Sequence, residues 1–177
     1  MNLPRILVVT GIMASGKSTV AQAIAERLPS AVHLRGDVFR KMIVTGRAAI
    51  EPQTMQQAEA QLVMRYELAA AAAKRYAREG FSIVWQDVIL GSHLARVAAL
   101  LAGEDFGVLV LCPTPDTVAE REAARAKTGY VGWTPAMLDA GLRNETPRIG
   151  LWLDTTSLTV TQTVDAVFSR APETRTA

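Results

Sequence analysis

The stretch GIMASGKS at residues 11–18 constrains the fold of this chain more than any other feature. It fits the pattern G-x-x-x-x-G-K-[ST] and lies between the apolar, β-branched run at 5–10 and a segment of helical apolar spacing at 17–28. A glycine-rich turn from strand to helix directs successive backbone N–H groups inward, and the positive end of the helix dipole adds to them. The sequence therefore predicts a phosphate-binding loop with a nucleoside triphosphate as its ligand.

Individual side chains of this loop have separate predicted roles. Lys17 is expected to reach the β- and γ-phosphates as a catalytic group, and the hydroxyl of Ser18 is expected to ligate Mg²⁺. The sequence lacks an N-K-x-D stretch, the usual guanine-recognition motif of GTPases, so ATP is favoured over GTP. ATP and Mg²⁺ are therefore the expected cofactors. The predicted nucleotide-binding residues are Gly11, Ile12, Met13, Ala14, Ser15, Gly16, Lys17, Ser18 and Thr19.

Strands and helices alternate along the rest of the chain. Short apolar runs predict further strands at 31–35, 81–86, 106–112 and 150–154. Helical spacing predicts helices after Asp37, at 53–79, 92–102 and 116–127, from Pro135, and at 160–170. This alternation is typical of βαβ units. We expect a three-layer α/β P-loop NTPase fold, with a five-stranded parallel sheet flanked by helices.

The domain organisation is expected to be simple. No repeat or linker divides the chain, so one P-loop kinase domain is predicted over residues 1–170. A short lid is expected at about 121–135, and a frayed, flexible tail at 171–177.

Composition and charge narrow the classes of function. The 177 residues carry a formal net charge of +2, which is too small to argue for nucleic acid or an anionic membrane as a partner. The single cysteine, Cys112, excludes an intramolecular disulfide, and its apolar flank predicts a buried thiol. One cysteine and two histidines are too few for a zinc cluster. Without a signal pattern or an apolar run of membrane-spanning length, a cytoplasmic protein is expected. The oligomeric state is not predicted.

The segment LRGDVFRKM follows the second predicted strand and carries Asp37 and Arg40. Ligands of open α/β sheets bind at the carboxyl ends of the strands, where Asp37 is expected, and Arg40 follows on the same helix face. A carboxylate can accept the proton of an attacking hydroxyl, and an arginine can hold an anionic or polar acceptor. Asp37 is therefore a predicted catalytic base and Arg40 a predicted substrate-binding residue. The alternatives are a helix N-cap for Asp37 and a solvated helix face for Arg40.

The third predicted strand ends in IVWQDVILG, which places Asp87 at another carboxyl end. Asp87 is a predicted substrate-binding residue, and the alternative role at this position is to hold Mg²⁺ through water. Gln86 is its polar neighbour. The alternative is a cap for the following helix.

The segment EREAARAK carries Arg121 and Arg125 on one helix face, four residues apart. After a fourth strand, such a segment is typical of the lid of a small-molecule kinase. Both arginines are predicted catalytic residues that neutralise charge on the transferred phosphoryl group. The alternative is a charged surface helix with Glu120 and Glu122 as partners.

Four further residues are candidates for the site. Arg143 and Arg148, near the fifth strand, either contact phosphate or are solvated. Tyr130 and Trp133 either line an acceptor pocket or pack the lid.

The order of these motifs resembles the small P-loop kinases, most closely the chloramphenicol phosphotransferase-like and zeta-toxin-like phosphotransferases. The resemblance rests on the phosphate loop, Asp37, QDVILG and VAEREAAR, and it spans nearly the whole chain. It implies ATP and Mg²⁺, a base matching Asp37, and lid arginines matching Arg121 and Arg125. LRGDVFRKM is also similar to the DGD-x-x-R segment of adenylylsulfate kinases, and gluconate kinases share the layout. The segment at 41–68 departs from the drug-binding part of the chloramphenicol enzymes, so no particular acceptor is predicted.

The expected function is an ATP-dependent kinase that transfers the γ-phosphate to a hydroxyl of a small molecule, with antibiotics among the candidate acceptors. Two alternatives stay open. One is a nucleotide-dependent switch or regulatory ATPase. The other is a kinase acting on adenylylsulfate, a sugar acid or a nucleic-acid end, the last through a basic groove of Arg40, Lys41, Arg47 and Arg65.

Overall fold

One parallel sheet organises the protein in the computed structural model, which describes residues 3–49, 55–124 and 132–175. Its strand order is β2-β3-β1-β4-β5, and every neighbouring pair is parallel. The predicted five-stranded parallel sheet is confirmed. The strands are β1 (Ile6–Thr10), β2 (Ala31–Arg35), β3 (Ser82–Gln86), β4 (Phe106–Leu111) and β5 (Leu151–Leu153).

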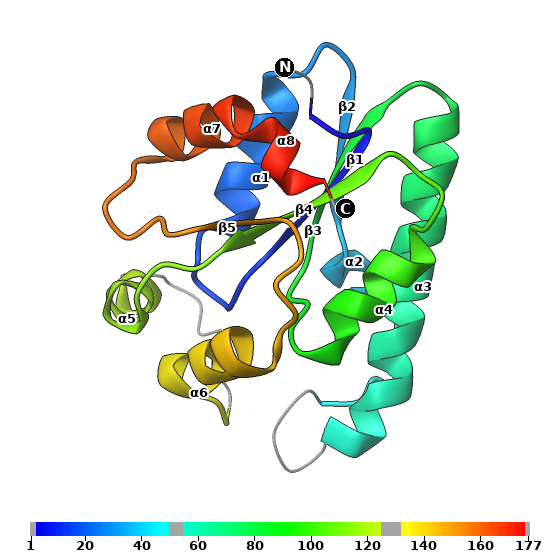
Figure 1. Ribbon diagram of the computed structural model, residues 1–177. Helices are drawn as coiled ribbons and strands as arrows, with labels where there is room; N and C mark the ends of the chain where they lie inside the picture. The colour runs from blue at the N-terminus through cyan, green and yellow to red at the C-terminus, as the bar shows by residue number, and fades with distance from the viewer. Residues whose placement is uncertain (1–2, 50–54, 125–131, 176–177) are drawn as a thin grey trace.

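Helices cover both faces of this sheet, with α1 and α7 on one side and α3 and α4 on the other (Figure 1). They lie within a few residues of the predicted ranges, but a π-helix, η1, directly continues α6 and was not predicted. The helices are α1 (Lys17–Glu26), α2 (Asp37–Lys41), α3 (Met55–Arg78), α4 (Ser92–Leu100), α5 (Pro115–Ala123), α6 (Pro135–Ala140), η1 (Gly141–Glu145), α7 (Val160–Ser169) and α8 (Ala171–Thr174).

The core follows from this layering. All five residues of β1 are buried, as expected for a strand that is covered on both faces. Val9 packs with the α1 and α7 side, whereas Val8 packs with the α3 side, together with Trp85 and Tyr66. Cys112 is buried and free, as predicted, and burial raises the pKa of its thiol. Among the described residues, no helix has the length and apolarity needed to cross a bilayer.

The expectation of a frayed tail does not hold for residues 171–175. Ala171 and Thr174 are buried, and Arg175 forms a β-bridge with Gly107 of β4 and an ion pair with Asp105. A Cβ on Gly107 would lie 2.6 Å from the carbonyl oxygen of Thr174, so the glycine allows the close approach of this end of the chain.

Candidate nucleotide and acceptor site

The loop between β1 and α1 has a backbone conformation that suits anion binding. Gly11 and Gly16 have φ of 141° and 95°, and Ala14 is the one described non-glycine residue with positive φ, at 61°. A Cβ on Gly11 would lie 2.4 Å from the carbonyl oxygen of Leu111, so no other residue fits there. The N–H of Ser15 donates to the carbonyl oxygen of Ile12 at 3.2 Å and fixes the turn. Such left-handed positions direct backbone N–H groups into a concavity that suits phosphate.

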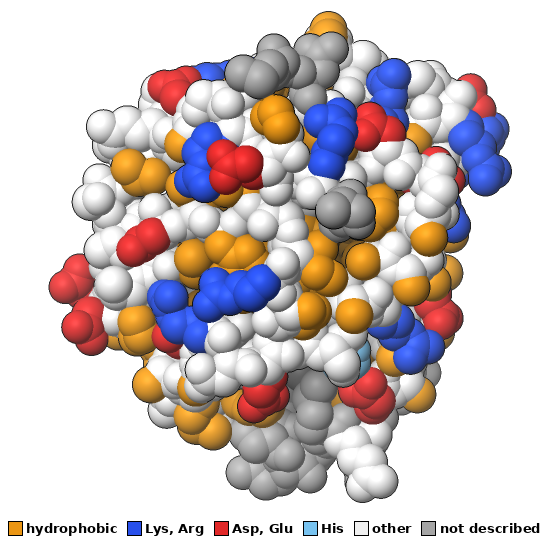
Figure 2. All heavy atoms as spheres, viewed as in Figure 1, with side chains coloured by type: hydrophobic (Ala, Val, Ile, Leu, Met, Phe, Trp, Pro, Cys, Tyr) orange, Lys and Arg blue, Asp and Glu red, His pale blue; other side chains and the backbone are white. Residues whose placement is uncertain are grey.

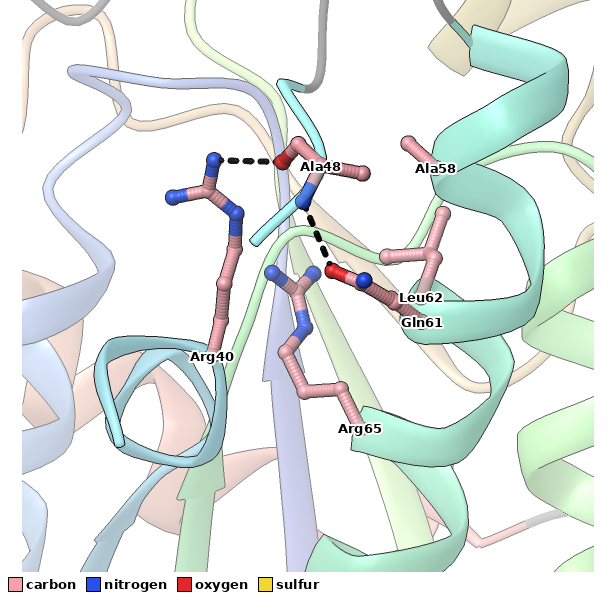
Figure 3. Close-up of a pocket in the computed structure, with 6 residues that line it drawn as sticks. All are labelled: Arg40, Ala48, Ala58, Gln61, Leu62 and Arg65. Atoms are coloured by element: carbon pink, nitrogen blue, oxygen red, sulfur yellow. Dashed lines mark hydrogen bonds between the residues drawn. The ribbon is translucent and has the colours of Figure 1, made fainter. Parts of the chain in front are cut away.

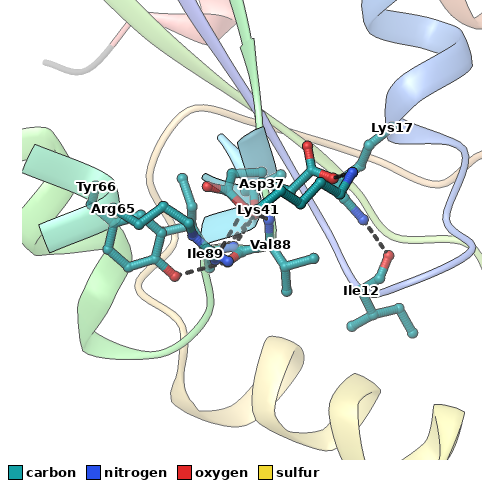
Figure 4. Close-up of polar contacts among 10 residues, drawn as sticks. Ile12, Lys17, Asp37, Lys41, Arg65, Tyr66, Val88 and Ile89 are labelled. Carbon is teal, nitrogen blue, oxygen red and sulfur yellow. Dashed lines mark hydrogen bonds and ion pairs between the residues drawn. The ribbon is translucent and has the colours of Figure 1, made fainter. Parts of the chain in front are cut away.

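Lys17 lies at the first position of α1 and is buried. Its Nζ donates to the carbonyl oxygen of Ile12 at 2.7 Å, across the loop (Figure 4). The ammonium group therefore lies at the loop where the sequence predicts phosphate binding.

The predicted metal residue, Ser18, contacts the end of β3. Its hydroxyl donates to Oε1 of Gln86 at 3.1 Å. The next residue, Asp87, has a buried Oδ2 atom without a hydrogen-bond partner in the described part of the chain. Oxygen donors of these kinds suit Mg²⁺, which nucleotide sites hold through few carboxylates together with phosphates. The described residues include no cluster of three or more His, Cys, Asp or Glu that could hold a metal alone. The donors present thus fit a nucleotide-bound Mg²⁺.

Asp87 is paired with Arg65 of α3, an arginine that sequence reasoning did not assign to this carboxylate. Nη2 of Arg65 lies 3.1 Å from Oδ1 of Asp87, and both side chains are buried. The backbone N–H of Val88 donates to the same oxygen at 2.8 Å. Burial raises the pKa of Asp87 from its ordinary value of 3.8 to about 6, against the opposing effect of Arg65. Asp87 is not a helix cap, because α4 begins at Ser92 with Gly91 as its N-cap.

The position of the Asp87 carboxylate also requires a glycine at residue 36, directly after β2. A Cβ on Gly36 would lie 1.9 Å from Oδ2 of Asp87 and 3.1 Å from Nε1 of Trp85. Gly36 therefore leaves room for the buried carboxylate of Asp87, and the charge of the following, partly exposed Asp37 contributes to raising the pKa of Asp87.

Asp37 is the first residue of α2, whose N-cap is Gly36, so the capping interpretation of Asp37 is wrong. Its carboxylate instead forms an ion pair with Lys41, one turn further along the helix. The Asp37 side chain is 40% exposed, which leaves it accessible to a small molecule.

A cavity of about 680 Å³ connects Asp37 with the phosphate loop. It is bordered by Met13 of the loop, by Asp37 and Arg40 of α2, by Arg65 of α3 and by Trp133 before α6. Asp87 does not line this cavity. The volume is in the range of sites for small organic ligands.

Arg40 is partly buried at the cavity wall. Its Nη2 donates to the carbonyl oxygen of Ala48 at 3.0 Å, and the N–H of Ala48 donates to Gln61 of α3 at 2.9 Å (Figure 3). The chain after α2 is thereby tied to α3. Arg65 is buried and paired with Asp87, so it does not extend a surface groove of basic residues.

The predicted lid is described only in part. Nη2 of Arg121 donates to the carbonyl oxygen of Thr155 at 2.9 Å, and its Nη1 lies 4.0 Å from the position of a Cβ on Gly16. Arg121 thus lies beside the phosphate loop. Arg125 and Tyr130 lie outside the described residues.

The two arginines near β5 have structural partners. Nε of Arg143 donates to both oxygens of Asp139, at 3.0 and 2.8 Å, and its Nη2 donates to the carbonyl oxygen of Cys112 at 3.1 Å. Arg143 therefore fixes η1 against the end of β4. The guanidinium of Arg148 lies 4.0 Å from the ring centroid of Trp152.

Comparison with known proteins places this arrangement in a family. A family model described as an AAA domain matches residues 6–147, from the start of β1 to just beyond η1. The chain belongs to this AAA-domain family. The match implies nucleotide binding by the phosphate loop. A UPF0200 protein of Aeropyrum pernix is 30% identical to this AAA-domain protein over 131 residues, covering 72% of this chain and 68% of the relative.

Solved structures share the fold of this AAA-domain protein at low identity. The tunicamycin resistance protein of Deinococcus radiodurans has a TM-score of 0.70 and 18% identity, and 95% of each chain is covered. An APS kinase of Mycobacterium tuberculosis, in complex with AMPPNP and APS, has a TM-score of 0.70 and 19% identity, covering 97% of this chain and 99% of that one. The chain therefore shares its fold with this resistance protein and with this APS kinase.

Proposed function

We propose that this protein is a cytoplasmic ATP- and Mg²⁺-dependent phosphotransferase that moves the γ-phosphoryl group of ATP to a hydroxyl of a small molecule. The observation that supports this most is the cavity of about 680 Å³, because Met13 of the phosphate loop and the carboxylate of Asp37 both border it. A hydroxyl bound there would lie between a base and the end of a bound triphosphate.

The transfer needs groups that bind the nucleotide, hold the metal and stabilise the transferred phosphoryl group. The loop backbone and Lys17 bind the phosphates, and Ser18, with Asp87 acting through water, would hold Mg²⁺, which neutralises phosphate charge when bound. Arg121 and Arg125 stabilise charge on the transferred group.

Asp37 takes the proton in this reaction. The acceptor oxygen forms a bond to the γ-phosphorus while the bond from that phosphorus to the β–γ bridging oxygen breaks. ADP leaves with the electron pair of the broken bond, and the hydroxyl proton passes to the carboxylate of Asp37. Arg40, one turn along α2, orients the acceptor.

Three chemical classes are candidates for the acceptor. The sequence resemblance to chloramphenicol phosphotransferase-like proteins, and the fold shared with a tunicamycin resistance protein, support an antibiotic as one candidate. The fold shared with an APS kinase supports adenylylsulfate, and a sugar acid remains a third candidate. Basic and acidic side chains are interspersed on the face seen in Figure 2, which does not favour a nucleic-acid acceptor.

The experiment is ATP consumption with Mg²⁺ over a panel of hydroxyl compounds, with mass spectrometry of each for an added phosphoryl group. The panel holds chloramphenicol, tunicamycin, gluconate, adenylylsulfate, nucleosides and an oligonucleotide. We expect one class to gain a phosphoryl group with native protein and not with Lys17→Met. ATP hydrolysis stimulated by a protein partner, with no compound modified, would favour the regulatory ATPase instead. Failure to bind ATP would overturn both.

A further inference from the structure

The acceptor cavity has an extensive apolar wall. Its main apolar side chains are Leu62, Tyr66, Val88, Leu90, Met137 and Leu138. Tyr66 is held against the segment after β3, since its hydroxyl donates to the carbonyl oxygen of Val88 at 2.8 Å. A polyol in contact with this wall would lose water around its hydroxyl groups without gaining hydrogen bonds in return, which is unfavourable. The wall instead favours an acceptor with an apolar body.

The charges that border the cavity are not all compensated. Lys41 is paired with Asp37, and Arg65 is paired with Asp87. Arg40 donates to the backbone carbonyl of Ala48 but has no carboxylate partner within the described part of the chain. Glu145, the other carboxylate at the cavity, is exposed to water.

Arg40 lies in an environment that favours an anion. Its Nε is buried and has no hydrogen-bond partner among the described residues. Burial and the positive charges of Arg47 and Arg65 lower the pKa of Arg40. Figure 3 shows the guanidinium groups of Arg40 and Arg65 in a second, smaller pocket between α2 and α3, and both side chains also line the acceptor cavity. An anionic ligand group would supply the missing counter-charge and a hydrogen-bond acceptor.

We infer that the acceptor is an amphipathic hydroxy acid, with its anionic group on Arg40, its hydroxyl near Asp37 and its apolar body on the wall formed by α3 and α6. This inference rests on the proposed function for the hydroxyl position alone. Asp37 and Arg40 are three residues apart on α2, about 5 Å along a helix, so one small molecule can reach both.

Three probes separate the anionic and apolar contributions. 3-Phenyllactate has an aryl group, a hydroxyl and a carboxylate; 3-phenylpropane-1,2-diol replaces the carboxylate by a neutral group; gluconate keeps the carboxylate but has a polyol body. Isothermal titration calorimetry without nucleotide should show 3-phenyllactate binding at least about tenfold more tightly than either of the others.

Variants assign each contribution to its residue. Arg40→Gln should lower the affinity for 3-phenyllactate about tenfold, to that of the diol, without changing the affinity for the diol. Met137→Gln, at a side chain that is 49% exposed and therefore tolerant of exchange, should weaken both aryl probes and spare gluconate. Val44→Gln is the control, since Val44 is 90% exposed and does not line the cavity.

Several outcomes would overturn the inference. In native protein, these are an affinity for gluconate or for the diol equal to that for 3-phenyllactate, or no binding of any probe. In Arg40→Gln, the contradicting outcome is loss of diol binding. The probe series in native protein and the Met137→Gln variant keep the test decisive if Arg40→Gln fails to fold. The calorimetric experiment measures binding without turnover, so it tests the ligand class separately from the kinase activity. If the three probes bind as expected but no compound gains a phosphoryl group, the proposed kinase activity is wrong and the ligand class stands. If gluconate alone gains a phosphoryl group, the kinase activity stands and the amphipathic ligand class is wrong.

Discussion

Two carboxylate–cation pairs lie at the same edge of the sheet and differ chiefly in burial. Asp37 and Lys41 are 40% and 55% exposed, whereas Asp87 and Arg65 are 3% and 9% exposed. The first pair spans one turn of α2, and the second joins the end of β3 to α3.

The difference in exposure favours different roles for the two ion pairs. An exposed ion pair contributes little to stability and can exchange partners, so Asp37 can leave Lys41 to accept a proton. A buried pair is held by the penalty of leaving either charge alone, so Asp87 stays fixed beside Gln86 and the phosphate loop. Under the proposed function, the same residue type therefore provides the base at one strand end and a rigid carboxylate at the next. Substitutions at both pairs test this contrast.

The largest effect is expected from Asp37→Asn. The amide keeps the shape but cannot accept the proton, so turnover with the acceptor found in the panel should fall about 10²- to 10⁴-fold. The affinity for ATP should not change. Steady-state kinetics and equilibrium nucleotide binding measure the two quantities.

Asp165→Asn is the matched control, because Asp165 is an ion-paired carboxylate on α7, remote from the cavity, with a side chain 60% exposed. Equal turnover in Asp37→Asn and the control would remove Asp37 as the base.

The two cations should differ in their effect on stability. Arg65→Met leaves the buried Asp87 carboxylate uncompensated and should lower the free energy of unfolding by about 3–5 kcal/mol. Lys41→Met removes an exposed pair and should cost about 0–1 kcal/mol. Urea denaturation of both variants compares them directly, and similar losses would contradict the contrast.

Asp87 should make stability depend on pH. The folded protein keeps the Asp87 proton up to about pH 6, whereas the unfolded chain releases it near 3.8. Between these values the folded state binds more protons, so the free energy of unfolding falls as pH rises, by roughly 3 kcal/mol in all. Asp87→Asn lacks this contribution.

The difference in unfolding free energy between the native protein and Asp87→Asn isolates the effect of this group. It should shift by roughly 3 kcal/mol in favour of the variant between about pH 4 and pH 7. A difference that stays constant with pH would show that Asp87 titrates normally.

The smallest effect concerns the space that Asp87 occupies. Gly36→Ala would bring a Cβ within 1.9 Å of Oδ2 of Asp87 and should destabilise the protein by about 1–3 kcal/mol. Gly141→Ala is the control, since that glycine has helical dihedral angles and no atom within 4 Å of the added Cβ, and a gain of about 0.4–1 kcal/mol is expected. Thermal denaturation measures both variants. Equal melting temperatures would mean that the Asp87 carboxylate is not fixed.

The features that sequence predicted well depend on local spacing. The phosphate loop is a contiguous pattern, and its flanking strand and helix follow from apolar periodicity, so the parallel sheet could be predicted with them. Asp37 and Arg40 could be assigned to one face because they share a short helix, and both border the cavity.

The features that were missed depend on contacts between distant segments. No local pattern relates Arg65 to Asp87, since the pair forms only when α3 packs on β3. Arg143 was expected to contact phosphate or solvent, but the continuation of α6 into η1 brings it onto Asp139 and Cys112. The packing of residues 171–175 depends on the space left by Gly107 in β4, which no periodicity reveals.

The most direct test of the account is a crystal structure of the protein with AMPPNP and Mg²⁺. We predict that the γ-phosphate lies within hydrogen-bond distance of Nζ of Lys17 and faces the carboxylate of Asp37 across the cavity. A γ-phosphate directed instead into the open groove lined by Gln22 and His33, which shares no lining residue with the acceptor cavity, would contradict the proposal that the nucleotide and acceptor share one site.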